Sequence, residues 1–310
     1  MCDKEMKMLF NKIKDSDFEA IKIIQKNTQY NGSEWSRIYL KAWKFFDWDN
    51  MEIATKNDII FIRFVVGVDI EFFKQFNHIY LPPICTIDKA EEGINLAMAQ
   101  AKLDCEIFAM IGVPQEYIDA CKDPLFTYQE NINQSEYLYL TSDLVEFIGK
   151  KYHQKRNHIS AFDRLYPNYV FRPYKKEDRC SVEKLLMKWE SKKPEEYIEE
   201  DEQEEYYAIE RSLDMAFDEN VYPYVLEIDG KIVGFTLGEI TPSNVGIIHI
   251  EKADIEYNGI YSKLVNLYAK EVLSNTRLIN RQEDMGDEGL RQSKLSYKPI
   301  GYSFKYFLKY

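Results

Sequence analysis

The strongest constraint on the fold of this chain is a run of three strand patterns in its second half. Residues 222–228 and 231–240 are rich in aliphatic and aromatic residues, and Asp229-Gly230 separates them. An Asp-Gly pair between two such segments is typical of a two-residue β-hairpin turn. Residues 244–253 predict a third strand, so the second half is built around an antiparallel sheet.

Helices and further strands flank these three strands, and the pattern restarts after Pro167. The remaining elements expected in this half are a strand at 169–174, a helix at 176–189, a helix at 258–273, a strand at 277–280, a helix at 286–295 and a strand at 300–310. This order resembles that of a GNAT acyltransferase domain, and the first half can be read in a similar order. We therefore predict an α/β chain with mixed sheets that forms two tandem GNAT-like domains, residues 1–167 and 168–310.

The elements expected in the first half include two helices and a strand pair. Residues 1–14 predict a charged helix, and two apolar segments around Asn57-Asp58 predict a strand pair. A long amphipathic pattern at 141–165 predicts a helix that is broken at Gly149.

Composition excludes several classes of protein. Residues 1–7 lack the basic start and apolar stretch of a signal peptide, and the longest apolar run is shorter than the ~20 residues that span a bilayer. The five cysteines form no CxxC pair, so neither a disulfide framework nor a zinc site is expected. The net charge of -12 disfavours indiscriminate binding to nucleic acid, and we expect no DNA partner. These features predict a cytoplasmic protein.

Charge is uneven along the chain. Residues 150–180 are basic, whereas residues 195–214 are strongly acidic. The acidic run is interpreted as a solvated helix face or a connection. The basic run lies on an amphipathic helix pattern and is a candidate binding surface.

Three segments carry a family resemblance: GKKYHQKRNHI at 149–159, EKAD at 251–254 with YNGIY at 257–261, and NRQEDMG at 280–286 continued by GLRQSKLSYKP at 289–299. They resemble soluble relatives of the C-terminal domain of phosphatidylglycerol lysyltransferases. That family resembles two GNAT-like domains in tandem, as do the Fem-type peptidyltransferases.

The resemblance implies transfer of an aminoacyl group, carried as an ester on tRNA, to an acceptor such as a lipid hydroxyl. Aminoacyl-tRNA would then be a partner, no cofactor would be required, and peripheral contact with a membrane would be compatible with a lipid acceptor. The lipid enzymes carry a membrane-spanning N-terminal region that this sequence does not show. The acceptor and the amino acid are left open.

The basic helix offers phosphate ligands. Lys151 and Lys155 are four residues apart and share a helix face, with Arg156 and Asn157 beside them. They would bind the phosphates of tRNA or of coenzyme A, or they face water on a helix whose apolar side is core. His153 and His158 are five residues apart, which does not fit a helical metal pair, and no metal is expected.

Carboxylates follow the third strand of the second half. Glu251 or Asp254 would serve as the base that deprotonates an attacking hydroxyl or amine, or would cap the next helix and pair with Lys252. The following run, EYNGIY at 256–261, keeps one glycine of the Q/R-x-x-G-x-G/A signature that binds coenzyme A, and begins with an acid. An acid beside a pyrophosphate is unfavourable, so the run argues against ordinary acetyl-CoA use.

The segment after residue 280 holds the remaining candidates. We assign Glu283 to catalysis or, with Asp284, to holding an amine of the donor. Asn280 and Arg281 belong to the same polar loop. Arg281 and Arg291 would face a phosphate, and Tyr297 would donate to the oxyanion of the tetrahedral intermediate. A polar loop followed by an N-cap at Asp287 is the alternative.

Two alternatives to aminoacyl transfer stay open. The chain would be an N-acyltransferase that uses coenzyme A through a degenerate loop, or a non-catalytic module that binds tRNA, a nucleotide or a protein. The motifs GxxxxGK[ST], GxGxxG and GxSxG are absent, so the corresponding nucleotide and serine-hydrolase chemistries are excluded.

Overall fold

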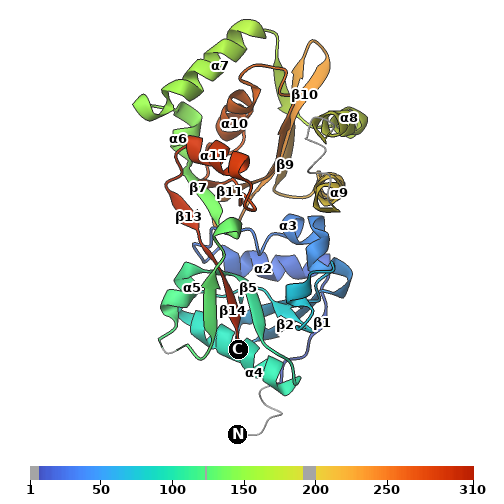
Figure 1. Cartoon of the computed structure of the whole chain (residues 1–310), viewed down its shortest axis with the longest axis vertical. Coiled ribbons are helices and arrows are strands. Elements are labelled where there is room, and N and C mark those ends of the chain that lie inside the picture. The colour runs from blue at the N-terminus through green and yellow to red at the C-terminus, as the bar shows by residue number, and fades with distance from the viewer. Residues whose placement is uncertain (1–6, 123, 191–199) are drawn as a thin grey trace. The chain divides into compact units, whose positions relative to one another are not determined.

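The computed structural model describes residues 7–122, 124–190 and 200–310, and over these residues the chain is a mixed α/β structure with two seven-stranded sheets (Figure 1). By its internal contacts the chain forms two compact units. The first contains residues 1–136, 283–286 and 302–310, and the second contains residues 137–282 and 287–301.

The first unit is built on a sheet with the strand order β1-β2-β3-β4-β5-β14-β6. Its strands are β1 (Asn11–Lys12), β2 (Glu52–Lys56), β3 (Ile59–Phe64), β4 (Ile79–Tyr80), β5 (Ala109–Pro114), β6 (Thr127–Glu130) and β14 (Lys305–Lys309). Its helices are α2 (Phe18–Gln25), α3 (Arg37–Ala42), α4 (Ala90–Leu103) and α5 (Gln115–Ala120), with 3₁₀ turns at Asp15–Asp17, Lys44–Phe46, Trp48–Asn50, Glu71–Phe73, Ile87–Lys89 and Ile132–Gln134. β3 is buried along almost its whole length, which explains its continuous apolar sequence.

The second unit is built on a sheet with the order β13-β7-β12-β11-β10-β9-β8. Its strands are β7 (Glu136–Leu140), β8 (Val170–Pro173), β9 (Val221–Ile228), β10 (Lys231–Ile240), β11 (Val245–Ala253), β12 (Leu278–Asn280) and β13 (Gly301–Ser303). Its helices are α6 (Thr141–Glu146), α7 (His153–Leu165), α8 (Arg179–Glu190), α9 (Glu200–Asp214), α10 (Ile260–Glu271) and α11 (Glu288–Ser296), with 3₁₀ turns at Lys150–Tyr152 and Lys176–Asp178.

The predicted hairpin is confirmed. Strands β9 and β10 pair antiparallel, and Asp229 and Gly230 both have positive φ, as the two-residue turn requires. The helix expected at 141–165 is divided as predicted, because Gly149 (φ 95°) separates α6 from α7. The helix expected at 1–14 is wrong for its described part: residues 7–10 are not helical, and Asn11 and Lys12 form β1 by pairing with β2. Residues 1–6, and residues 195–199 of the acidic run, lie outside the described part of the chain.

Strands β11 and β12 are paired over only a short stretch, and the site described below lies where they separate. They pair in parallel only from Val245 with Leu278 to Ile247 with Asn280. β12 ends there, whereas β11 continues to Ala253. The side chains that follow Asn280 therefore enter the space beside the second half of β11.

The boundaries of the two units differ from the single boundary at Pro167 that the sequence suggests. Strand β7 pairs with β12, so it and the helices after it belong to the second unit. Strand β14, at the other end of the chain, pairs with β5 and β6 in the first unit. Strand pairing between distant segments sets these units, and the periodicity of each segment carries no information about its partner.

A buried ionic cluster secures β14 in the first unit. Lys305 is 1% exposed, and its ammonium binds the carboxylates of Glu34 and of Glu136, the latter at 3.1 Å. Tyr30 donates to Glu34, and the Ser33 hydroxyl donates to Glu136. Burial would by itself lower the pKa of Lys305, but the two carboxylates raise it above its ordinary value. The lysine therefore stays charged and offsets part of the negative charge of a buried cluster.

Replacing Lys305 by Met should lower the free energy of unfolding of the first unit by about 3–5 kcal/mol, because two buried carboxylates lose their cation. Urea denaturation monitored by circular dichroism measures this change. Lys309→Met on the same strand, where the lysine is only half-buried, is the control and should cost less than about 1 kcal/mol. Equal midpoints for the two variants would contradict the role given to the cluster.

Candidate functional site

The centre of the candidate site is an ion pair in the second unit, where β11 and β12 separate. Glu251 lies on β11, and Arg281 directly follows β12. Both carboxylate oxygens of Glu251 accept hydrogen bonds from Nη2 of Arg281, at 3.1 and 3.0 Å. Their side chains are only 9% (Arg281) and 12% (Glu251) exposed. A charge-assisted pair at this depth needs both partners, since each neutralises the other.

Two tyrosine rings enclose the guanidinium. The carbon Cζ of Arg281 lies 4.4 Å from the ring centroid of Tyr297 and 5.7 Å from that of Tyr139. Its Nε and Nη1 are buried and have no hydrogen-bond partner within the described structure. Burial would lower the pKa of Arg281, but Glu251 raises it above its ordinary value, so the group stays charged. The site therefore contains a permanent positive charge shielded from water.

Lys155 brings a second cation to the same ring. It projects from α7 and is half-buried, with Nζ 3.4 Å from the ring centroid of Tyr297. Burial and the positive charge of Arg281 together lower its pKa to about 8, and Glu251 opposes the shift. Within the described residues its ammonium makes no hydrogen bond and no ion pair. Lys155 is thus poised to change protonation state close to neutral pH.

The position of Tyr297 is fixed by its backbone. It follows the last turn of α11, and its carbonyl accepts a hydrogen bond from the hydroxyl of Tyr152 at 3.1 Å. Burial raises the pKa of the Tyr297 phenol, so this group stays protonated and can act only as a neutral ring and hydroxyl. The ring orders both cations.

The loop that carries Arg281 is held by polar contacts to its backbone. Asn280 is fully buried, and its Oδ1 accepts from the backbone N–H of Gln282 at 2.7 Å. Lys294 of α11 donates to the carbonyls of Arg281 and Gln282, at 2.7 and 3.1 Å. Asn280 therefore shapes the loop. No group of residues that could hold a metal ion occurs in the described part of the chain.

Of the four candidates on the basic helix, the structure brings Lys155 to this centre. Lys151 is exposed and forms an ion pair with Asp143 at 2.9 Å. Arg156 donates from Nη1 to the carbonyls of Phe147 and Gly149, and Asn157 contacts His153 at 3.3 Å. These three side chains have local structural partners.

Asp254 is engaged away from the centre. Its carboxylate binds Lys188 at 2.6 Å and accepts from the backbone N–H of Glu256 at 3.2 Å. Burial would raise the pKa of Asp254, but Lys188 lowers it below its ordinary value. A carboxylate with a lowered pKa is a weak proton acceptor at neutral pH.

Three further candidates lie elsewhere. Glu283 and Asp284 belong to the first unit, where Glu283 accepts from the Tyr39 hydroxyl at 3.5 Å and Asp284 accepts from the backbone of Gly286 at 2.9 Å. Arg291 lies on α11 with Nη1 4.0 Å from Glu288.

Tyr139 was not expected from the sequence, because one tyrosine among 23 carries no signal before its strand is placed.

The first turn of α10, where a GNAT loop would receive a pyrophosphate, is covered by α7. A Cβ on Gly259 would lie 2.3 Å from the carbonyl oxygen of His158, and the φ of Gly259 is 82°. Lys263 on the next turn pairs with Asp163 of α7 at 2.7 Å. The backbone of α7 therefore packs closely against the start of α10, where only glycine fits.

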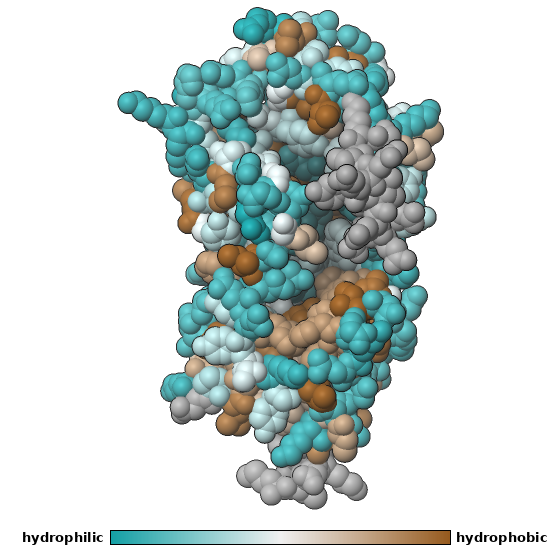
Figure 2. All heavy atoms as spheres, viewed as in Figure 1, coloured by the Kyte–Doolittle hydropathy of each residue, from teal (hydrophilic) through white to brown (hydrophobic). Residues whose placement is uncertain are grey.

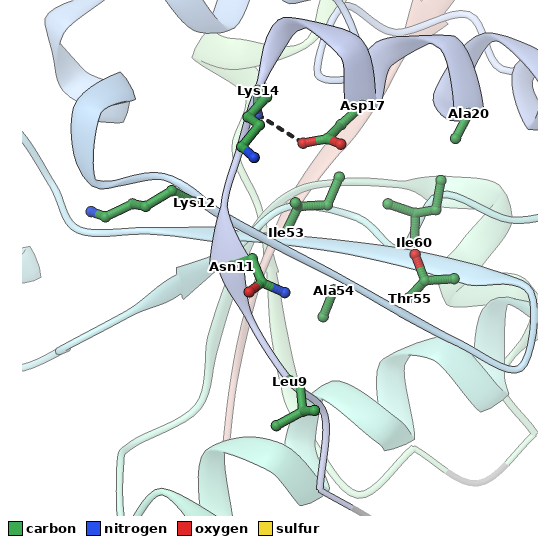
Figure 3. A pocket seen from close by; sticks show the side chains of 10 residues that line it. All are labelled: Leu9, Asn11, Lys12, Lys14, Asp17, Ala20, Ile53, Ala54, Thr55 and Ile60. Carbon is green, nitrogen blue, oxygen red and sulfur yellow. Dashed lines mark hydrogen bonds between the residues drawn. The ribbon is translucent and has the colours of Figure 1, made fainter.

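A separate cavity of about 460 Å³ opens in the first unit, between β1, β2 and the segment before α2 (Figure 3). Aliphatic side chains such as Ile53 and Ile60 line it together with Lys12 and Lys14, and the Lys14 N–H donates to Asp17 at 2.8 Å. None of the predicted site residues lines it.

On the face drawn in Figure 2 hydrophobic side chains are interspersed among hydrophilic ones. Among the described helices none is long and apolar enough to cross a membrane.

The fold and a family match together define the class of protein. The fold is a mixed α/β structure with two mixed sheets, as predicted. Residues 74–309 match the model of the family described as phosphatidylglycerol lysyltransferase, C-terminal. The chain belongs to this family, and the predicted resemblance is confirmed.

Solved structures agree with this assignment. A conserved protein of unknown function from Bacteroides thetaiotaomicron is 25% identical, with a TM-score of 0.83 over 97% of this chain and 99% of that chain. The L-PGS of Bacillus licheniformis (16% identity, TM-score 0.61, 94% and 90% covered) and FemX (10%, 0.62, 96% and 97%) share the fold. An uncharacterised protein of Mycoplasmoides gallisepticum is 27% identical over 64% of this chain, and the match spans 63% of that relative.

The buried pair predicts a measurable cost. Glu251→Gln should lower the free energy of unfolding of the second unit by about 3–5 kcal/mol, since Arg281 would keep its charge without a counter-charge. Thermal and urea unfolding measure this effect. Glu288→Gln, at an exposed position, is the control and should change stability by less than about 0.5 kcal/mol. A Glu251→Gln protein as stable as this control would show that the pair is not sealed from water.

Proposed function

We propose that this chain is an aminoacyltransferase that takes its aminoacyl group from aminoacyl-tRNA and acts at the cluster of Lys155, Glu251, Arg281 and Tyr297. The observation that carries the proposal is the pair of cations on the ring of Tyr297, beside the separated strands. Membership of the lysyltransferase family supports the reaction type.

The chemistry suits this cluster. An acceptor hydroxyl or amine attacks the ester carbonyl, and negative charge develops on the carbonyl oxygen. Fixed positive charge in a site of low polarity stabilises such an oxyanion more than water does. Arg281 would supply the N–H groups of Nε and Nη1, which have no hydrogen-bond partner within the described structure, while Glu251 and the two rings hold the guanidinium in place. No step requires a metal or an organic cofactor.

The donor and the acceptor define the partners. The relative from Bacillus licheniformis is named L-PGS, and the family is named for transfer to phosphatidylglycerol. For this chain we propose aminoacyl-tRNA as the donor, with a lipid headgroup, small molecule or peptide as the acceptor in the cytoplasm. A lipid acceptor would require peripheral contact with a membrane.

Use of coenzyme A is the less favoured alternative. Its pyrophosphate would have to reach the amides at the start of α10, where the carbonyl of His158 packs against Gly259. Glu256, adjacent to this turn, adds negative charge.

The proposal is tested with a pool of tRNA charged with labelled amino acids, incubated with the protein and with lipid or metabolite extracts. We expect loss of the aminoacyl ester and transfer of the label to one class of acceptor. Arg281→Lys keeps a charge for Glu251 but loses the guanidinium geometry, and it should slow transfer about 100-fold.

Lys270→Met, an exposed change on α10, is the control and should transfer at the wild-type rate. An ester that is stable with every amino acid would contradict the proposal and favour a binding module. Turnover of a coenzyme A thioester instead would favour the alternative enzyme.

A further inference from the structure

We propose that Lys155 accepts the proton of the attacking hydroxyl or amine. This inference rests on the function proposed above and assigns one step of it. The residue is placed for this step because it projects into the cluster from α7 and ends against the ring of Tyr297, with Nζ 3.4 Å from the ring centroid.

On balance the surroundings of Lys155 favour the neutral amine. Burial and the positive charges of Arg281 and Lys298 favour it, whereas Glu251 and the ring face of Tyr297 favour the ammonium. Both oxygens of Glu251 are bound by Arg281, so this carboxylate does not pair with Lys155. On α10, Lys263 pairs with Asp163. Within the described residues nothing accepts a hydrogen bond from the Lys155 ammonium.

These charges place the protonation change of Lys155 in the pH range in which a general base is effective. With burial and Arg281 lowering its pKa to about 8, about a tenth of Lys155 is neutral at pH 7. A base whose pKa lies near the working pH combines availability with proton affinity. An ordinary lysine would be almost entirely protonated there.

The carboxylates proposed from the sequence are less suited to this step. Glu251 is occupied by Arg281, and Asp254 is held by Lys188 with a lowered pKa. Lys155 is left as the group at the cluster that has a lone pair to offer when neutral and that makes no hydrogen bond or ion pair within the described part of the chain.

The step balances as follows. The acceptor O–H or N–H gives its proton to neutral Nζ as the acceptor atom forms a bond to the ester carbon. The tetrahedral intermediate then collapses, and the bond between that carbon and the ribose oxygen breaks. The Lys155 ammonium returns its proton to the leaving ribose oxygen, so the amine is neutral again at the end of the cycle.

The protonation state can be measured without any transfer assay. Trace acetylation of the folded protein over a pH series, read by mass spectrometry, follows the neutral fraction of each lysine. Lys155 should titrate near pH 8, and Arg281→Met should move its titration upward. Lys151 is the matched control, because Asp143 raises its pKa. Titration of Lys155 above pH 10 in the wild-type protein would overturn the inference.

The catalytic step is tested with Lys155→Arg, which keeps the charge but cannot accept a proton at neutral pH. We expect at least a 100-fold loss of transfer at pH 7.5 with charged tRNA still bound, and Lys270→Arg, an exposed change on α10, should behave as wild type. The wild-type rate should rise tenfold per pH unit below about pH 8.

The outcomes separate the two proposals. An active Lys155→Arg protein would overturn the role of Lys155 and leave the transferase function standing. A wild-type protein that transfers no aminoacyl group would overturn the proposed function and this step with it. Circular dichroism of Lys155→Arg and Lys155→Gln shows whether either variant is folded, and the acetylation titration decides the state of Lys155 independently of both.

Discussion

The second unit depends on the neutralisation of one buried guanidinium. Arg281 follows directly from β12, where the sheet opens, and its charge would be costly there without Glu251. The two tyrosine rings accept the faces of the group, while Lys294 and Asn280 hold the backbone that carries it. The same charge then acts on Lys155. One structural requirement, a compensated buried cation, thus shapes the electrostatics of the whole site.

The first unit also contains a buried ionic cluster, but there two carboxylates surround one cation. There a single ammonium, Lys305, lies between the carboxylates of Glu34 and Glu136 and offsets part of their charge. The three residues come from the loop before α3, the start of β7 and the C-terminal strand. Because segments from both ends of the chain meet in this cluster, the first unit is complete only when β14 has been added. This explains why the last strand belongs to the unit in which the chain begins.

The match to the lysyltransferase family and the geometry of the site answer different questions about this chain. Family membership and fold are shown by the sequence match and by the structures that share the architecture. The roles of Lys155 and Arg281 rest on distances and charges in this chain. The packing of α7 onto the first turn of α10 is the structural reason for proposing aminoacyl-tRNA rather than coenzyme A as the donor.

Local patterns in the sequence were sufficient to predict the hairpin at Asp229-Gly230, the helix break at Gly149 and the N-cap at Asp287, since each is decided by residues a few positions apart. They were also sufficient to select candidate site residues, because charged and aromatic residues cluster in the segments that resemble the family. These candidates include Glu251, Arg281, Lys155 and Tyr297. They could not show that Lys155 reaches the site while its neighbour Arg156 caps the end of α6, since adjacent residues of a helix point in directions about 100° apart. They also could not show that Asp254 meets Lys188, or that β14 joins the first sheet. Those partners are far apart in sequence, and only the folded chain brings them together.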